Sequence, residues 1–133
     1  MLIDAIFHHI GVATADIAKT AEAYLAAGYE MSDVAHDSMQ NVNIAFLYKP
    51  GCPLLELVEP ADEASPVRNI IKKVGVTAYH FCYEAINLDE SIAQLRQKKF
   101  VLFLKPVGSV AFGGRRICFL YHKDVGLIEL LEK

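Results

Sequence analysis

The chain has 133 residues, of which 53% are hydrophobic and 22% are charged, a composition typical of an ordinary globular protein. Its formal net charge of −3 provides no basic surface, so neither nucleic acid nor an anionic membrane is an expected partner. Its apolar stretches are all far shorter than a membrane span. We expect one domain over residues 1–133, because halves of about 60 residues would bury too little surface to fold alone.

The cysteine content favours a reducing compartment. Cys52, Cys82 and Cys118 form no CxxC pair and are odd in number, which argues against a disulfide framework. Residues 1–4 lack the basic region and long apolar core of a secretion signal. We therefore expect a cytoplasmic protein.

The first half of the chain has the pattern of a strand, a helix and three further strands. An extended run over residues 6–13 precedes Asp16, which suits a helix N-cap, and apolar residues then recur at helical spacing as far as Gly28. Further strand-like stretches cover residues 30–35, 42–48 and 54–58. A Lys-Pro-Gly turn separates the last two.

The second half repeats this order. A strand over residues 76–85 precedes a helix that Asn87 or Asp89 can cap and that extends to Lys99. Strands are then expected over residues 101–104, 116–122 and 127–131. Residues 60–75 link the halves, with a short helix expected over 66–73. The pattern predicts an α+β fold of two βαβββ modules, over about residues 5–59 and 76–132.

Each half also carries a His early and a Glu late, both inside apolar, strand-like runs. His9 lies 47 residues before Glu56, and His80 lies 49 residues before Glu129. A carboxylate in such a run is costly to bury unless something pairs with it. Alone, a His or Glu in a strand is more often a core or surface residue, but the repeat favours four inward side chains that meet. Together they predict a site for one divalent metal.

Strand alternation decides which neighbours share a face with these residues. His80 shares its face with Cys82 and Glu84, and Cys82 is interpreted as a small apolar core residue rather than a ligand. His8 should point away from His9, so it is not expected to be a ligand.

Two arginines are candidates for binding the substrate. Arg115 and Arg116 follow Gly113 and Gly114, a flexible approach that suits a phosphate or a carboxylate. An exposed hairpin with charged residues explains them equally well.

Three segments of the chain resemble the vicinal oxygen chelate superfamily, which contains glyoxalase I, methylmalonyl-CoA epimerase and extradiol dioxygenases. They are the opening HHIGVATADIAKTAEAYLAAGY, the central LLELVEP and the final GGRRICFLYHKDVGLIELLE. The similarity covers residues 6–132 and is greatest to the epimerase-like branch. It implies two βαβββ modules that form one cupped mixed sheet with helices outside, in a homodimer. It also places metal ligands on the four residues of the repeat, His9, Glu56, His80 and Glu129.

The subfamily features of the chain are mixed. Methylmalonyl-CoA epimerases tend to have Gln at the position of Glu56, where glyoxalase I has Glu. Glyoxalase I typically has an Arg at the position of Ala13.

The expected function is a metal-dependent epimerase or isomerase that removes a proton next to a metal-polarised carbonyl. Zn, Co, Ni, Mn or Fe(II) would suit the ligands, and Glu129 or Glu56 would be the base. The substrate would be a small molecule, an acyl-CoA thioester or a hemithioacetal. The alternatives are a glyoxalase I-like lactoylglutathione lyase, an Fe(II) dioxygenase and a non-catalytic, drug-sequestering binding protein.

Overall fold

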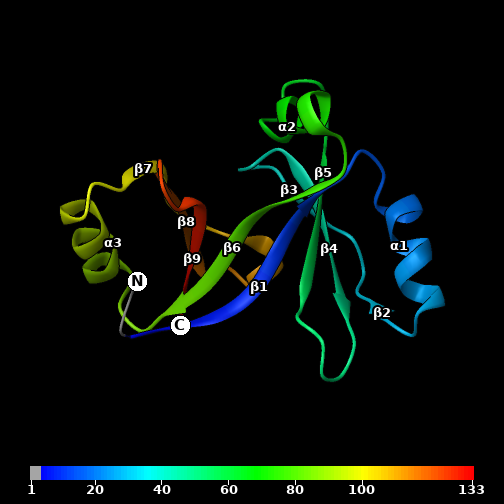
Figure 1. Cartoon of the computed structure of the whole chain (residues 1–133), viewed down its shortest axis with the longest axis horizontal. Helices are drawn as coiled ribbons and strands as arrows, with labels where there is room; N and C mark the ends of the chain where they lie inside the picture. Colours follow the sequence, from blue (N-terminus) through cyan, green and yellow to red (C-terminus); the bar gives the residue numbers. More distant parts are fainter. Residues whose placement is uncertain (1–3) are drawn as a thin grey trace. The chain divides into compact units, whose positions relative to one another are not determined.

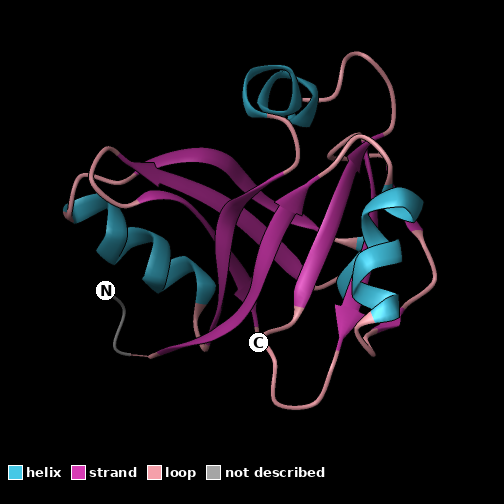
Figure 2. Cartoon of the chain, turned by 45° about the vertical axis from the view of Figure 1, so that its right-hand side comes forward, coloured by secondary structure: helices cyan, strands magenta, loops and turns pink. Residues whose placement is uncertain are grey.

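The computed structural model of the protein describes residues 4–133 and assigns them to nine strands and three α-helices (Figures 1 and 2). The elements in chain order are β1 (Ala5–Ala13), α1 (Ile17–Ala26), β2 (Glu30–Met31), β3 (Ala35–Asp37), β4 (Val42–Tyr48), β5 (Leu55–Pro60), α2 (Val67–Val74), β6 (Thr77–Ala85), α3 (Leu88–Gln97), β7 (Val101–Gly108), β8 (Arg116–His122) and β9 (Gly126–Glu132). The expectation of no secretion signal rests mainly on residues 1–3, which lie outside the described residues. Within residues 4–133, the helices are too short or too polar to cross a membrane.

The described residues divide into two compact units. Unit 1 comprises residues 4–8 and 80–133, and unit 2 comprises residues 9–79. Strands β1 and β6 therefore contribute residues to both units.

Unit 2 contains a mixed sheet covered by α1. Its strand order is β2-β4-β5-β1, in which β1 and β5 are parallel and the other pairs antiparallel, while β3 also pairs with β4. Helix α1 lies alongside β4 (Figure 1) and buries Ile17 and Ala21 in the core. Its N-terminus is held by Asp16, which accepts a hydrogen bond from the Lys19 N–H, and by Glu59, which accepts one from the Ile17 N–H. Both carboxylates suit the positive end of the helix dipole.

Unit 1 repeats this arrangement. Its strand order is β6-β9-β8-β7, with β6 and β9 parallel and the other pairs antiparallel. The first residues of β1 lie beside β6, where the ring of Phe7 contacts Phe81 and Tyr83. Helix α3 covers this sheet and buries Leu88 and Leu95 in the core.

The expected α+β class with two βαβββ modules is confirmed, and the strand boundaries differ most in two places. The stretch predicted as one strand over residues 30–35 is divided into β2 and β3. Ser32 explains the division, because its hydroxyl accepts the Phe46 N–H in place of a backbone carbonyl. The strand predicted over residues 101–104 extends to Gly108, and its pairing with β8 shifts register after Leu102 and after Leu104.

Arg116 joins three elements of unit 1. It begins β8, and its guanidinium donates hydrogen bonds to Glu132 of β9 and to Asp89 of α3. The hydrogen bond from Arg116 lowers the pKa of the Glu132 carboxyl below its ordinary value of 4.5. The charged form of Glu132 is therefore favoured in the folded state.

We predict that Glu132→Gln reduces the pH dependence of stability in the acid range. Because the folded-state pKa of Glu132 is lowered, its contribution to stability is complete above the unfolded-state pKa and is lost as the pH falls through the folded-state pKa. The variant should be less stable than the wild type at pH 7, and the difference should disappear as the pH falls through the lowered folded-state pKa of Glu132. Urea unfolding measures the free energy of unfolding of both proteins between neutral and acid pH and tests this prediction. Glu22→Gln on α1 is the control. A difference that stays constant with pH would contradict the assignment.

Candidate metal centre

Unit 2 holds one buried His–Glu pair. His9 on β1 is fully buried and Glu56 on β5 is 3% exposed, with His9 Nε2 3.5 Å from Glu56 Oε1. Glu56 lies in register with Gly11, so alternation places it on the same face of the sheet as His9. The predicted first pair is thus brought together by the parallel pairing of β1 and β5.

Unit 1 holds the second pair in the same arrangement. His80 on β6 is 3% exposed and Glu129 on β9 is 2% exposed, with His80 Nε2 3.6 Å from Glu129 Oε1. Strands β6 and β9 are also parallel, and Glu129 lies in register with Cys82. The repeat seen in the sequence is therefore a repeat of geometry within each unit.

Each His–Glu pair lies beside a phenylalanine that was not predicted from the sequence. Phe46 is in register with Glu56, and its ring meets that of His9 edge-on at 6.0 Å. Phe119 is in register with Glu129, and its ring meets that of His80 edge-on at 5.1 Å. Each Phe precedes its Glu by ten residues, a second repeat that could have identified them. These rings limit water at the carboxylates.

Each His–Glu pair has the donor atoms and the spacing expected of two ligands of one divalent metal. The N···O separations of 3.5 and 3.6 Å exceed the roughly 2.7–3.2 Å of a good hydrogen bond. Two ligands about 2.1 Å from one ion at a tetrahedral angle would be about 3.4 Å apart. Imidazole nitrogen with carboxylate oxygen suits Zn, Co, Ni, Mn or Fe(II).

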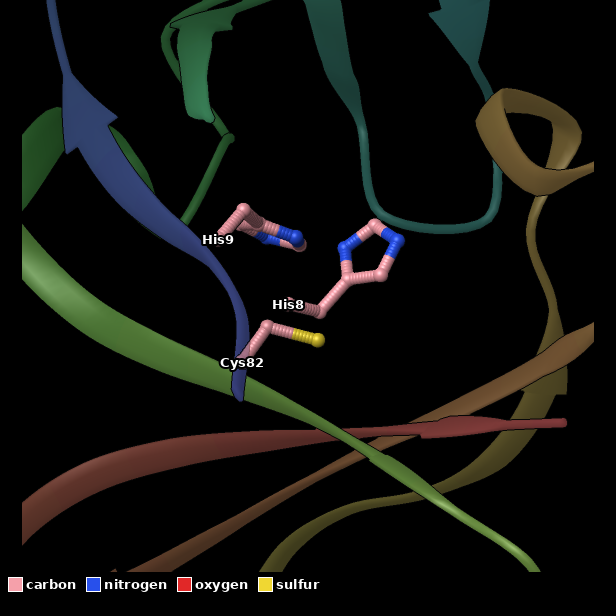
Figure 3. A group of neighbouring side chains, drawn as sticks. All are labelled: His8, His9 and Cys82. Atoms are coloured by element: carbon pink, nitrogen blue, oxygen red, sulfur yellow. The ribbon is translucent and has the colours of Figure 1, made fainter. Parts of the chain in front are cut away.

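The prediction that His8 points away from this chemistry is wrong. Figure 3 shows the side chains of His8 and His9 on the same side of β1, with Cys82 on β6. In unit 1, ligand atoms of His8 and Cys82 lie within 4.8 Å of one another, and the ring of His8 contacts Phe112.

Both candidate arginines form ion pairs with carboxylates of this chain. Arg115 donates to Glu84 and to the carbonyl of Glu132, and Arg116 pairs with Glu132 and Asp89. Glu84, which the alternation of β6 places on the face of His80, is thereby held by a cation. Binding of a substrate anion by these arginines stays a prediction, and the ion pairs provide each with a structural role.

The two buried cysteines lie on different faces of unit 1. Cys82 packs with Ile117, Phe119 and Leu131. Cys118 packs beneath α3, where burial and, secondarily, the charge of Glu129 raise the pKa of its thiol to about 12. Cys52, in contrast, is half-buried.

Comparison with known proteins gives a consistent result. Residues 8–119 match the family model of the glyoxalase/bleomycin resistance protein/dioxygenase superfamily. The human mitochondrial methylmalonyl-CoA epimerase is 27% identical over 127 residues, which cover 92% of this chain and 71% of the relative.

Two solved structures are similar in fold over almost the whole chain. The methylmalonyl-CoA epimerase from Mycobacterium tuberculosis is 27% identical, with a TM-score of 0.83 over 95% of this chain and 86% of its own. A variant of the Streptomyces coelicolor methylmalonyl-CoA epimerase, in complex with 2-nitronate-propionyl-CoA, is 30% identical, with a TM-score of 0.82 over 96% of both chains.

We predict that one thiol of the folded protein reacts quickly with iodoacetamide and that this thiol is Cys52. The thiolate is the reactive form, and burial shields Cys82 and Cys118. Mass spectrometry should find one rapid modification in buffer, absent in Cys52→Ser, and three in denaturant. Rapid labelling of Cys82 or Cys118 in buffer would contradict their burial.

Proposed function

Because the chain belongs to the glyoxalase/bleomycin resistance/dioxygenase superfamily, we propose that it is a divalent-metal-dependent epimerase similar to methylmalonyl-CoA epimerase. The observation that carries the proposal is the doubled pair of buried His and Glu on parallel strands. The epimerases among its relatives and the acyl-CoA complex of one of them support a CoA thioester as substrate. Three free cysteines agree with a cytoplasmic location.

In this proposal the two pairs serve one ion. The ligands are His9, Glu56, His80 and Glu129, two neutral imidazoles and two carboxylates whose charges balance a divalent cation. When bound, such an ion polarises a carbonyl oxygen and makes the proton on the adjacent carbon more acidic. The repeat supports the assignment, because both units present the same two residue types on equivalent strands.

Proton transfer then requires a base within reach of the α-carbon. Glu129 is our proposed base, with Glu56 as the equivalent carboxylate of the other unit. Phe119 lies in register with Glu129, so one side of this carboxylate is covered by an apolar ring. Inversion requires delivery of a proton to the opposite face of the α-carbon, and protonated Glu56 is our proposed donor for that step, with solvent restoring the protonation of the two carboxylates between turnovers. Glu84 is not used, because Arg115 holds it.

A glyoxalase I-like lyase is the second candidate, and Glu56 is the observation that favours it. The side chain is a carboxylate, as in glyoxalase I, and it is buried beside His9 as a second potential base. Conversion of the hemithioacetal of glutathione and methylglyoxal, in place of exchange in acyl-CoA thioesters, would establish the lyase.

We predict that the metal-loaded protein exchanges the α-proton of methylmalonyl-CoA in D2O. Glu129→Gln should lower this rate by about 10²-fold or more, because general base catalysis typically contributes about 10²–10⁴. Glu132→Gln is the matched control, three residues along β9 and in an exposed ion pair, and should keep the wild-type rate. Chelation should abolish exchange and readdition of metal restore it. Absence of exchange in every acyl-CoA tested would overturn the proposal.

We also propose that the protein is a homodimer, as the resemblance implies. Apolar side chains such as Ile6, Phe103 and Ile86 are at least 65% exposed in the single chain, and a second copy that covered them would remove apolar area from water. Light scattering coupled to size exclusion should give twice the chain mass of 14.7 kDa. A mass of one chain at micromolar concentration would contradict it.

A further inference from the structure

Two buried donors without an acceptor lie at the start of helix α2 in unit 2. Ser65 is 2% exposed, and its Oγ has no hydrogen-bond partner among residues 4–133. The Nε of Arg68 is also buried and forms no hydrogen bond within the described part of the chain. Leaving such a donor unsatisfied costs free energy, so two of them three residues apart indicate a missing acceptor. The proposed metal centre uses neither residue.

Ser65 stands at the N-terminal end of α2. Pro66 has helical dihedral angles, with φ −57° and ψ −29°, and proline is favoured as the first residue of a helix. The Ser65 carbonyl accepts the Arg68 N–H at 3.1 Å, as the carbonyl of a capping residue does. A serine in this position directs its hydroxyl over the N–H groups of the first turn. Because the Ser65 hydroxyl bonds to none of the described residues, it is suited to a ligand that brings its own acceptor.

The first turn of α2 is also electropositive. The N–H groups at the start of an α-helix have no partner within the helix, and together with the helix dipole they favour an anion. The first turn of α2 contains no acidic residue, Arg68 adds a guanidinium there, and Lys72 follows one turn later. A hydroxyl, a guanidinium and backbone N–H groups together are suited to the several acceptor oxygens of a phosphate group.

The carboxylate of Glu63 lies beside these donors and is weakly held. Its Oε1 is 3.5 Å from Arg68 Nε, and its Oε2 is 3.8 Å from Lys72 Nζ. Both separations exceed those of a good hydrogen bond, and Glu63 is 77% exposed, so these ion pairs contribute little. Asp62, the other acidic neighbour, accepts a hydrogen bond from the Asn41 amide, which lowers the pKa of its carboxyl. A phosphate group, with more charge and more acceptor oxygens, can therefore replace Glu63 at Arg68.

Helix α2 belongs to the same unit as the first His–Glu pair and follows the strand that carries Glu56. The helix packs against β5 and lies at one end of that strand (Figure 1). The strand from Glu56 to Pro60 spans about 13 Å at about 3.3 Å per residue. A phosphate bound at α2 is thus remote from Glu56, as the phosphates of CoA are remote from its thioester.

We propose that the first turn of α2 binds a phosphate group, with the Ser65 hydroxyl, the Arg68 guanidinium and the Val67 N–H as donors. Val67 is buried in unit 2, which fixes the backbone of this turn. A phosphate of a CoA thioester and a free phosphate monoester share this chemistry. The assignment to CoA rests on the proposed function, and the site itself does not.

Inorganic phosphate, acetyl-CoA and acetylpantetheine, which lacks phosphate, test the site on the full chain. The backbone amide signals of Val67 and Arg68 in NMR titrations report binding at this turn separately from binding at the metal centre. Inorganic phosphate and acetyl-CoA should shift both signals, and acetylpantetheine should shift neither. Ser65→Ala and Arg68→Gln should each weaken phosphate binding about tenfold or more, as expected for a hydrogen bond to a charged group. Glu63→Gln should strengthen it, because the competing carboxylate is removed.

Lys73→Gln is the matched control, because it removes the same charge from the last turn of α2. It should bind phosphate as the wild type does, and a loss equal to that of Arg68→Gln would overturn the site by reducing it to unspecific attraction. Ser65→Ala should unfold at the same temperature as the wild type or higher, and a loss of stability would overturn the role of the hydroxyl by making it a helix cap.

The site and its ligand are decided by separate results. Shifts with inorganic phosphate but not with acetyl-CoA would contradict the assignment to CoA and support a free phosphate monoester. Absence of shifts with either probe would overturn the site while leaving the proposed epimerase intact. Binding of acetyl-CoA at this turn without α-proton exchange in any acyl-CoA would support the site and overturn the proposed function.

Discussion

The burial of two carboxylates within apolar strands is the constraint on which the rest of this structure depends. Glu56, near the start of β5, and Glu129, in the middle of β9, are almost fully removed from solvent. An unpaired charge there would cost several kcal/mol, so each carboxylate needs a partner on the neighbouring strand. The parallel pairing of these strands with β1 and β6 places a histidine beside each one.

The same solution occurs twice because the chain repeats one module. In both units the helix between the first two strands of the module covers the outer face of the sheet, which leaves the other face for the His–Glu pair. A phenylalanine in register with each glutamate shields it from water. In each unit, imidazole nitrogen and carboxylate oxygen are donors that suit a divalent ion, and the proposed epimerase needs such an ion to stabilise an enolate.

The two modules differ in residues outside the His–Glu pairs. Unit 1 adds a tight loop after β7, with the hydroxyl of Ser109, and the imidazole of His8. Arg115 and Arg116, which the sequence suggested for substrate binding, join strands β6, β8 and β9 to helix α3 through ion pairs.

The sequence by itself determined the α+β class, the two βαβββ modules and the identity of both His–Glu pairs. These features are local or repeated: strand alternation, helix caps such as Asp16 and Asn87, and the spacing of His and Glu all lie within the linear pattern. Only the tertiary structure decided the strand register that places Phe46 and Phe119 beside the glutamates. It also decided which carboxylates form ion pairs with Arg115 and Arg116. It also decided the direction of His8 and the burial of Ser109. The physical reason is that these depend on contacts between residues far apart in the chain, which neither periodicity nor spacing encodes.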